Sequence, residues 1–263
     1  MLVFLKLGGS LITDKTRPYT PRLDKIKILS AEIASALQEN DGIQLILGHG
    51  SGSFGHQAAN QFGTRNGVSN PEAWRGFSEV WYQASTLNRF IVEGIRSAGL
   101  PGVTLAPFPA VIANDGNVIC WDLTPIKFGL EKGLLPIIHG DVVFDTTRGG
   151  TILSTEDLFS YLAPHLNPNR ILLAGLEDGI WADFPTRHHL LKEMTPESYK
   201  VLASGMGQSL ATDVTGGMDS KVAGMLSLLP RIPKLEVLIF SGGVPGNVHR
   251  ALMGENPGTL LHC

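Results

Sequence analysis

The chain has 263 residues, of which 43% are hydrophobic and 31 are glycine, and its formal net charge is −3. This length allows one large α/β domain or two small ones, and the charge gives no indication of a nucleic-acid partner. Cys120 and Cys263 lack metal-ligand spacing and make a poor disulfide framework. Because no apolar run is long enough for a signal peptide core at the start or for a membrane span, we expect a soluble, cytoplasmic protein.

Short apolar strands alternate with helical patterns along almost the whole chain. We expect strands at residues 2–7, 43–47, 134–139, 170–174, 235–240 and 259–262, and helices at 22–38, 71–98, 155–165 and 219–229, with another beginning at 195–197. The run "VIANDGNVI" predicts a hairpin through Asn114, Asp115 and Gly116. This alternation indicates an α/β protein, a three-layer αβα sandwich around an open, mainly parallel sheet, in a single domain of residues 1–263.

Glycine clusters follow most of the expected strands. They are Gly8–Gly9, Gly48–Gly55, Gly140, Gly175–Gly179 and Gly242–Gly243, while Gly216–Gly217 opens a helix. In open α/β sheets, ligands bind at the carboxyl ends of the strands. The coincidence of glycine clusters with strand ends therefore predicts a ligand site along this edge.

The run "LILGHGSGSFGH" contains a GxGxxG pattern at Gly50, Gly52 and Gly55, which is typical of dinucleotide-binding proteins. Such a site also needs an acidic residue at the end of the next strand. Glu72 has the right spacing but lies at a helix start, and the chain has no GxxxxGK[ST] segment. We therefore favour two glycine loops that hold two phosphate groups over a dinucleotide site.

Three lysines are candidates for binding anions. Lys6 ends an apolar strand just before Gly8, and a desolvated ammonium there needs a strong anion, although a lysine that reaches water is the alternative. Lys221 lies in the first turns of a helix, where backbone N–H groups attract phosphate, although a surface lysine is equally compatible. Lys15, taken alone, is equally compatible with a solvated loop residue.

A histidine and an aspartate are further candidates. His56 closes the second glycine loop and opens a helical stretch, so its imidazole can reach whatever the loop binds. Asp157 lies at a helix start, where a simple first-turn acid favoured by the helix dipole is the alternative. His49 and His139 are compatible with purely structural roles.

The motifs "KLGGS", "GHGSGSFGH", "GD" (Gly140–Asp141), "STEDL", "EDGIW" and "TGGMDSK" occur in this order along nearly the whole chain. Together they resemble the amino acid kinase superfamily and, within it, the isopentenyl phosphate kinases, through "GGSLITDK", "GSGSFGH" and "DVTGGMDSKV". The resemblance implies an open αβα sandwich that is usually homodimeric. It also implies ATP and Mg²⁺ in the carboxy-terminal half and isopentenyl phosphate in the amino-terminal half.

Carried over by position, the resemblance assigns the ATP site to Lys6, Gly8, Gly9, Ser10, Gly52, Asp178, Trp181, Gly216 and Lys221. It assigns the substrate phosphate to Gly50, Ser51, His56 and Gly140, places Lys15 by the transferred group, and has Asp157 orient the lysines. The chain departs from the pattern in "GLEDGIW", where related kinases often read "TDVDGVY". Leu176 replaces the first aspartate, which weakens the assignment of the adenine and ribose contacts.

The chemistry of this reaction suits the residues present. A phosphate monoester has a second pKa of about 6 and is a nucleophile at neutral pH, so the site must supply positive charge and fixed donors rather than a base. We expect direct in-line transfer from ATP to isopentenyl phosphate, giving isopentenyl diphosphate and ADP. Phe77 and Trp81 are candidates for an apolar pocket around the five-carbon tail, with ordinary core packing as the alternative.

Other functions remain open at this point. Fosfomycin kinase, acetylglutamate kinase and carbamate kinase have the same fold, and fosfomycin kinase shares a phosphonate-type acceptor. A non-catalytic nucleotide-binding regulator is disfavoured, because Lys6, Asp157 and Lys221 all match the kinase pattern.

Overall fold

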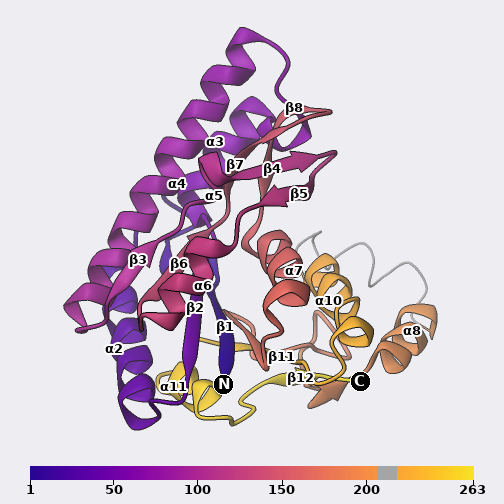
Figure 1. Ribbon diagram of the computed structural model, residues 1–263. Coiled ribbons are helices and arrows are strands. Elements are labelled where there is room, and N and C mark those ends of the chain that lie inside the picture. The colour runs from indigo at the N-terminus through magenta and orange to yellow at the C-terminus, as the bar shows by residue number, and fades with distance from the viewer. Residues whose placement is uncertain (206–217) are drawn as a thin grey trace.

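The computed structural model describes residues 1–205 and 218–263, apart from the side chains of His56, residues 203–205, Met218 and Asp219. Its main sheet has the strand order β10-β12-β11-β9-β1-β2-β6-β3 (Figure 1). The bounds are β1 Leu2–Leu7, β2 Gln44–His49, β3 Gly102–Thr104, β6 Leu135–His139, β9 Arg170–Gly175, β10 Glu193–Met194, β11 Glu236–Ser241 and β12 Thr259–Leu261. Neighbouring strands are parallel except β11 and β12, which confirms the mainly parallel sheet.

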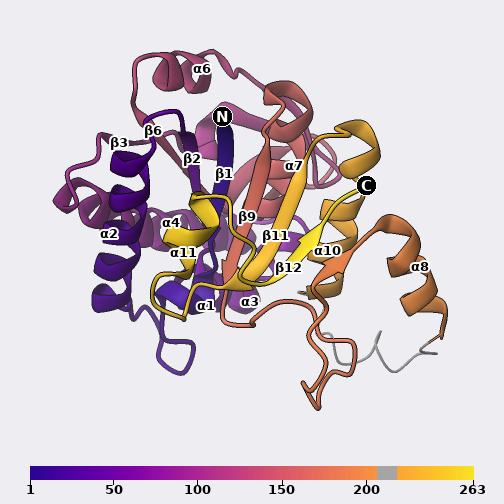
Figure 2. The same ribbon diagram turned by 90° about the horizontal axis from the view of Figure 1, so that it is seen from below.

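Helices cover both faces of this sheet, as the alternating pattern predicts. One face packs against α2 (Leu23–Glu39), α4 (Pro71–Ser97) and α11 (Asn247–Leu252), and the other against α7 (Thr155–Leu166) and α10 (Met218–Leu226). Figure 2 shows the first three helices together on one side. The other helical segments are α1 Gly9–Ile12, α3 Gly52–Phe62, α5 Pro107–Ala110, α6 Thr124–Glu131, α8 Pro196–Gly205, η1 Thr64–Asn66 and η2 Leu229–Arg231. Among the described helices, none is both long and apolar enough to cross a membrane.

Side-chain alternation along the central strands decides which residues face which helix layer. On β1, Val3 and Leu5 pack in the core of the α2 and α4 face, whereas Phe4 packs in the core of the α7 face. The ring of Phe4 lies 5.0 Å from that of Phe159 on α7, measured between centroids. Lys6 has the same parity as Phe4, so the strand directs its side chain toward α7.

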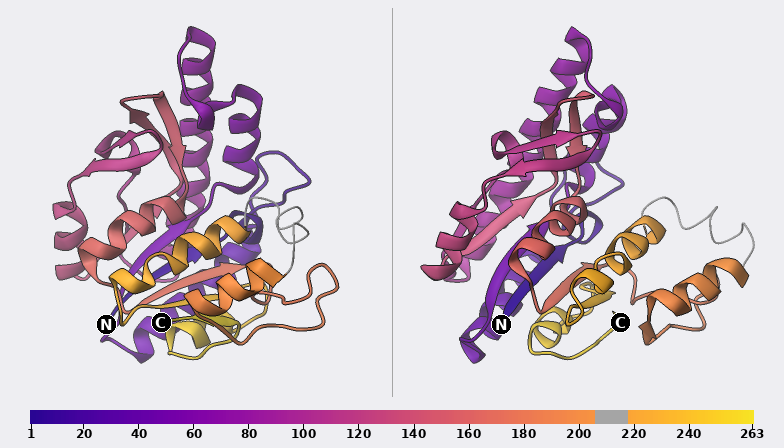
Figure 3. Two further views of the ribbon diagram at one scale, coloured as in Figure 1. Left: turned by 90° about the vertical axis from the view of Figure 1, so that its right-hand side faces the viewer. Right: turned by 45° about the vertical axis from the view of Figure 1, so that its right-hand side comes forward.

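A second, smaller sheet has the order β5-β4-β7-β8 and stands beside the amino-terminal part of α4 (Figure 3). It contains the predicted hairpin, as β4 (Val111–Asn114) and β5 (Asn117–Trp121), together with β7 (Asp141–Asp145) and β8 (Gly149–Leu153). The sequence did not predict β7 and β8, nor β3 and β10 of the main sheet. A single residue, Gly140, separates β6 from β7.

Candidate active site

The loops that follow β1 and β2 meet at the carboxyl edge of the main sheet. A Cβ added to Gly9 would overlap the backbone of Gly52, and one added to Gly50 would lie 2.9 Å from the Gly9 nitrogen. The hydroxyl of Thr13 donates to the Gly9 carbonyl at 2.7 Å and accepts from the Ser53 N–H at 3.0 Å. The two hydrogen bonds of Thr13 thus hold the predicted phosphate loops against each other. Glycine occupies the positions at which a side chain would push the two loops apart.

Both loops also open helices, and this exposes backbone donors. The first N–H groups of a helix have no acceptor within the helix. Gly9 opens α1 and Gly52 opens α3, so their N–H groups lie where the two loops touch. Gly52 has a φ of +50°, a left-handed conformation that favours glycine. This backbone arrangement can hold anionic oxygens between the two loops.

Lys6 and Lys221 share one carboxylate, that of Glu156 on α7. Lys6 and Glu156 are both 8% exposed and form a direct ion pair. Lys221, on α10, lies 3.6 Å from the other carboxylate oxygen of Glu156 and its side chain is 43% exposed. The structure therefore brings together two predicted lysines from opposite ends of the chain, next to the glycine loop after β1.

The electrostatics of this group favour a net positive charge. Burial alone would raise the pKa of Glu156, but the charges of Lys6 and then Lys221 outweigh burial and hold that pKa below its usual value. Burial lowers the pKa of Lys6, and the carboxylate of Glu156 is the largest opposing influence. Two ammonium groups around one carboxylate leave one positive charge uncompensated, which an incoming phosphate can pair with.

Asp157, which is expected to orient the lysines, makes its hydrogen bonds at the start of α7. Its carboxylate accepts the N–H and hydroxyl of Ser154 at 2.7 Å each, and Ser154 Oγ accepts the Asp157 N–H at 3.1 Å. This is a capping box at the start of α7. Asp157 also lies 3.7 Å from Arg65. The structure thus places Glu156, rather than Asp157, between the two lysines.

Other residues of the predicted site lie around this centre. Ser10 lies in α1 beside Gly9, and Gly140 lies between β6 and β7, where a Cβ would approach the start of α7. Lys15 lies exposed in the loop 14–20, which packs against α3 through the rings of Tyr19 and Phe54. His56 is in α3, but its side chain is outside the described part of the structure, as is the whole of Gly216.

The predicted nucleotide residues after β9 lie in a surface loop. Asp178 is exposed in a turn, and Trp181 is partly buried. The indole N–H of Trp181 donates to the Glu177 carboxylate at 3.2 Å, and Arg187 pairs with the same carboxylate at 2.7 Å. The loop therefore has internal polar contacts, and it begins at the carboxyl end of β9, next to Gly8.

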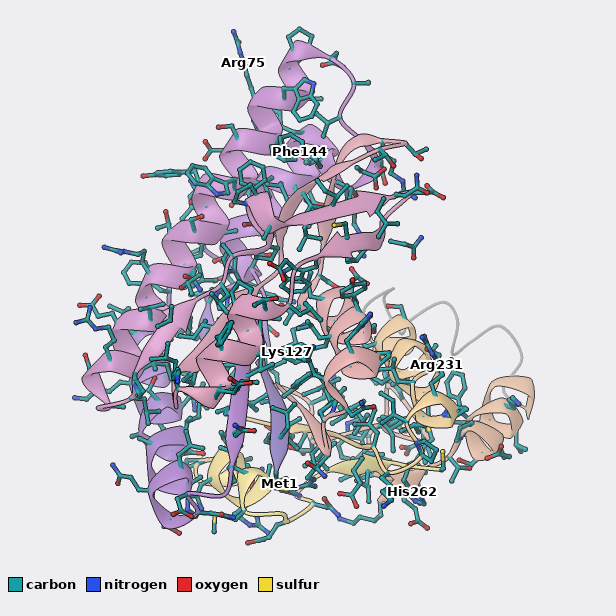
Figure 4. The ribbon with its side chains drawn as sticks, viewed as in Figure 1. Met1, Arg75, Lys127, Phe144, Arg231 and His262 are labelled. Carbon is teal, nitrogen blue, oxygen red and sulfur yellow. The ribbon has the colours of Figure 1, made fainter. Side chains whose placement is uncertain are left out.

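Phe77 and Trp81 differ in their surroundings. Phe77 is 6% exposed and packs among Trp74, Phe108 and Phe144, with centroid distances of 5.2, 5.6 and 5.7 Å. Figure 4 shows Phe144 between the small sheet and α4. Trp81 is 40% exposed and contacts Phe108 at its edge. The aromatic cluster of Trp74, Phe77, Trp81, Phe108 and Phe144 thus joins α4 to the small sheet.

His49, at the end of β2, is completely buried on the α4 face. Burial, followed by the neighbouring His139, lowers its pKa to about 3. In the unfolded chain it would take up a proton below about pH 6.5 that the native protein excludes. As the pH is lowered from about 6.5 toward 3, protonation of His49 in the unfolded chain is therefore expected to reduce the free energy of unfolding by about 1.4 kcal/mol per pH unit.

Urea unfolding at a series of pH values between about 7 and 5 measures this slope. His49→Asn removes the titrating group and should reduce the slope by an amount that corresponds to close to one bound proton. An unchanged slope would show that another group titrates. Glu156 does not interfere in this range. Its lowered pKa makes its contribution to stability disappear only as the pH falls below the usual glutamate value.

Three residues of this region were missed from the sequence. Thr13 has no signal in the sequence, because its bridging hydroxyl depends on a contact with Ser53, 40 residues along the chain. For His49, the sequence indicated no more than a structural role. Glu156 had a usable signal, because the pattern Ser154-x-x-Asp157 is a capping box that leaves the preceding carboxylate free for other partners.

Comparison with known proteins agrees with this geometry. A model of the amino acid kinase family matches residues 1–241. The chain is 34% identical to the isopentenyl phosphate kinase of Methanocaldococcus jannaschii, over 99% of this chain and 98% of that protein. It is 30% identical to the enzyme of the same name from Methanothermobacter thermautotrophicus, over 97% and 96%. A solved isopentenyl phosphate kinase structure matches with a TM-score of 0.83 and 28% identity, covering 99% of this chain and 100% of that chain. The chain therefore belongs to the amino acid kinase family and, within it, to the isopentenyl phosphate kinases.

Proposed function

We propose that the protein transfers the terminal phosphoryl group of ATP to the phosphate of isopentenyl phosphate, giving isopentenyl diphosphate and ADP. The observation that carries this proposal is the contact between two glycine loops, beside a cluster of two lysines and one carboxylate. One loop would hold the phosphates of ATP and the other the phosphate of the acceptor. Family membership supports both the reaction and the acceptor.

The reaction needs charge compensation more than proton transfer. The acceptor phosphate is already ionised at neutral pH, so its oxygen attacks the terminal phosphorus in line with the departing ADP oxygen. Lys6 and Lys221 would offset the charge on the nucleotide phosphates, and the N–H groups of Gly9, Ser10 and Gly52 would donate to them. Gly50, Ser51, His56 and Gly140 would bind the acceptor phosphate, with Lys15 closing over the transferred group from the loop 14–20.

We also propose Mg²⁺ as the metal that accompanies ATP. Mg²⁺ is commonly held by substrate phosphates with few protein ligands. The site fits that mode, because Glu156 is already paired with two lysines. When bound, the metal would neutralise part of the phosphate charge.

The test of the function is ADP release with a panel of acceptors: isopentenyl, dimethylallyl and geranyl phosphates, fosfomycin, acetylglutamate and carbamate. Isopentenyl phosphate should give a kcat/KM well above those of fosfomycin, acetylglutamate and carbamate. Equal or better turnover of acetylglutamate would assign the chain to a different kinase of the same fold. Absence of ADP release with every acceptor would favour a nucleotide-binding regulator.

The role proposed for His56 has its own prediction. If the imidazole donates to the acceptor phosphate, His56→Ala should lower kcat/KM by about tenfold to a hundredfold, the usual range for a hydrogen bond to a charged group. His56→Gln should recover part of the loss, because an amide can still donate. The control is ATP binding by calorimetry, which both variants should retain, and an alanine variant with unchanged kcat/KM would exclude the role.

Selection of the acceptor's length is expected to depend on the aromatic cluster. Phe77→Ala should open room for a longer prenyl chain, since each buried CH₂ contributes about 0.8 kcal/mol. The ratio of kcat/KM for geranyl over isopentenyl phosphate should therefore rise, while KM for ATP changes little. Trp81→Ala is the matched comparison, because this side chain is half exposed at the edge of the same cluster.

A melting curve separates this effect from plain core damage. Phe77 is buried among aromatic rings, so its removal is expected to lower the free energy of unfolding by about 3–5 kcal/mol. Equal loss of activity on both acceptors, together with a lowered melting temperature, would identify Phe77 as a packing residue only. If neither variant shifts the ratio while remaining folded, the pocket wall lies elsewhere.

A homodimer and a cytoplasmic location complete the proposal. The edge strand β3 exposes Val103 beside the exposed Leu134, and an unpaired apolar edge favours association with another chain. Light scattering after size exclusion tests the dimer. Cys120 and Cys263 are both free and exposed, as expected where thiols stay reduced.

A further inference from the structure

The side chain of His49 bonds with the second glycine loop on one side and with helix α4 on the other. Its Nδ1 lies 3.1 Å from the carbonyl oxygen of Gly50, and its Nε2 lies 3.0 Å from the amide nitrogen of Asn88. The hydroxyl of Thr104, on β3, donates to Asn88 Oδ1 at 2.6 Å. A hydrogen-bonded series thus runs from β3 through α4 to the loop.

The chemistry of these groups fixes the direction of every bond. A carbonyl oxygen can only accept, so the proton of the ring must be on Nδ1 and is donated to Gly50. The lowered pKa of His49 keeps the ring neutral at physiological pH. Nε2 therefore accepts from the Asn88 amide, whose oxygen accepts from Thr104. Both ring nitrogens of His49 therefore have a partner of the matching kind.

The backbone around His49 is held as firmly as its ring. Its carbonyl accepts the hydroxyl of Thr155 at 2.6 Å and the N–H of Gly140 at 3.3 Å. The N–H of Gly50 donates to the Leu7 carbonyl at 3.0 Å. Since glycine has no side chain to restrict its own backbone, these external bonds determine how the Gly50 peptide is oriented.

The bond from His49 has a direct consequence for the loop. In a trans peptide, the carbonyl of one residue and the N–H of the next point in opposite directions. With the Gly50 carbonyl turned toward the buried ring, the Ser51 N–H is turned away from it. We propose that His49 is a positioning residue, which orients the Gly50–Ser51 peptide so that the Ser51 N–H is presented to the acceptor phosphate.

This inference rests on the proposed function, because it assigns the loop after β2 to the acceptor. It predicts an effect on acceptor binding without an equal effect on ATP, whose phosphates are assigned to Lys6, Lys221 and the loop after β1, with the Gly52 N–H as the contact from the loop after β2. Fixed donors are effective because they need no rearrangement when the substrate binds.

The chain offers a matched control in His139. It is buried at the same depth, occupies the position opposite His49 on the adjacent strand β6, and stacks on the His49 ring with a centroid distance of 5.2 Å. Within the described residues, neither of its ring nitrogens has a hydrogen-bond partner, and its Nε2 lies 3.4 Å from the carboxylate of Asp141. Replacing His139 therefore removes a buried imidazole without removing a bond to the loop.

The experiment compares His49→Leu, His49→Asn, Asn88→Leu and His139→Leu in steady-state kinetics, with melting curves for each. His49→Leu should raise KM for isopentenyl phosphate by about tenfold or more and change KM for ATP by less than about threefold. His49→Asn should restore most of the affinity, since its amide N–H occupies the place of Nδ1. Asn88→Leu, which leaves the loop unaltered, should raise the same KM to a smaller extent.

Two results would overturn the inference. One is a His49→Leu enzyme whose KM for isopentenyl phosphate is unchanged. The other is an equal rise in both KM values that His49→Asn does not correct and His139→Leu reproduces, which would show that any buried imidazole here supports the fold alone.

Failure of the proposed function would be visible separately, as a wild-type protein that releases no ADP with isopentenyl phosphate. The inference is then judged by amide hydrogen exchange of the peptide that covers residues 50–53. His49→Leu should accelerate this exchange by about tenfold or more, and His49→Asn and His139→Leu should not. Unchanged exchange in His49→Leu would overturn the positioning role whatever the substrate is.

Discussion

Replacing Glu156 with glutamine is expected to lower kcat for phosphoryl transfer by about 10²–10³-fold, the range seen when one preorganised electrostatic contact is removed. The buried ammonium of Lys6 would lose the carboxylate with which it forms an ion pair and remain next to Lys221. Burial already lowers the pKa of Lys6, and the loss of Glu156 would lower it further. A neutral amine cannot compensate phosphate charge.

The direction in which the pKa of Lys6 changes can be tested by a second measurement. Because a lysine with a lowered pKa loses its proton at a lower pH, the alkaline limb of the pH–rate profile of Glu156→Gln should move toward lower pH. Activity should therefore be closest to wild type on the acid side of the profile. A uniform loss at every pH would indicate a structural fault instead of a lost charge on Lys6.

Asp157→Asn is the matched control, since it changes the neighbouring carboxylate on the same helix. It should lower the free energy of unfolding by about 0.5–2 kcal/mol, through the capping box, and change kcat by less than about threefold. The reverse ranking, with Asp157→Asn losing activity and Glu156→Gln retaining it, would restore the role first expected for Asp157.

Gly9→Ala should lower kcat/KM by about 10²-fold, because a displacement of about 1 Å between reacting groups can have an effect of this size. The added methyl would overlap backbone atoms of Gly52, which cannot rotate aside as a side chain could. The two loops would have to separate, and with them the two phosphates. Kinetics with both substrates, together with a melting curve, measure the effect.

Gly224→Ala is the control for this substitution. Gly224 lies in α10 with nothing within 4 Å of the position of an added Cβ. Alanine is favoured over glycine in a helix by about 1 kcal/mol, so this variant should retain activity and gain slightly in stability. An active Gly9→Ala enzyme would show that the loops need not touch during the reaction.

The sequence predicted the features that depend on local patterns. Apolar runs located most strands of the main sheet, though not the short strands β3 and β10. Glycine loops at strand ends indicated where a ligand would bind, and both signals lie within short segments. Lys6 and Lys221 were selected as candidates in the same way. Each lies next to a glycine motif whose backbone geometry limits what the lysine can do.

The features that were missed depend on packing between distant segments. Whether the second or third residue of α7 faces β1 is decided by how the helix lies on the sheet, so Glu156 and Asp157 could not be separated by position alone. The series through His49 joins three elements that only the tertiary fold brings together. The prediction of the small sheet was incomplete. Its hairpin has a local turn signal, whereas Gly140 alone separates β6 from β7.

The opposite orientations of Lys6 and His49 limit how the lengths of β1 and β2 can change during evolution. Lys6 and His49 lie one residue apart in the register of β1 and β2, since Lys6 pairs with Gly48 and Leu7 with His49, yet their side chains face opposite helix layers. A one-residue insertion or deletion in either strand would exchange every inward and outward side chain at once. Point substitutions can accumulate here one at a time, but a change in length would move the ammonium or the imidazole to the wrong side of the sheet. We therefore expect homologous chains to differ in loop lengths while the spacing within these two strands stays constant.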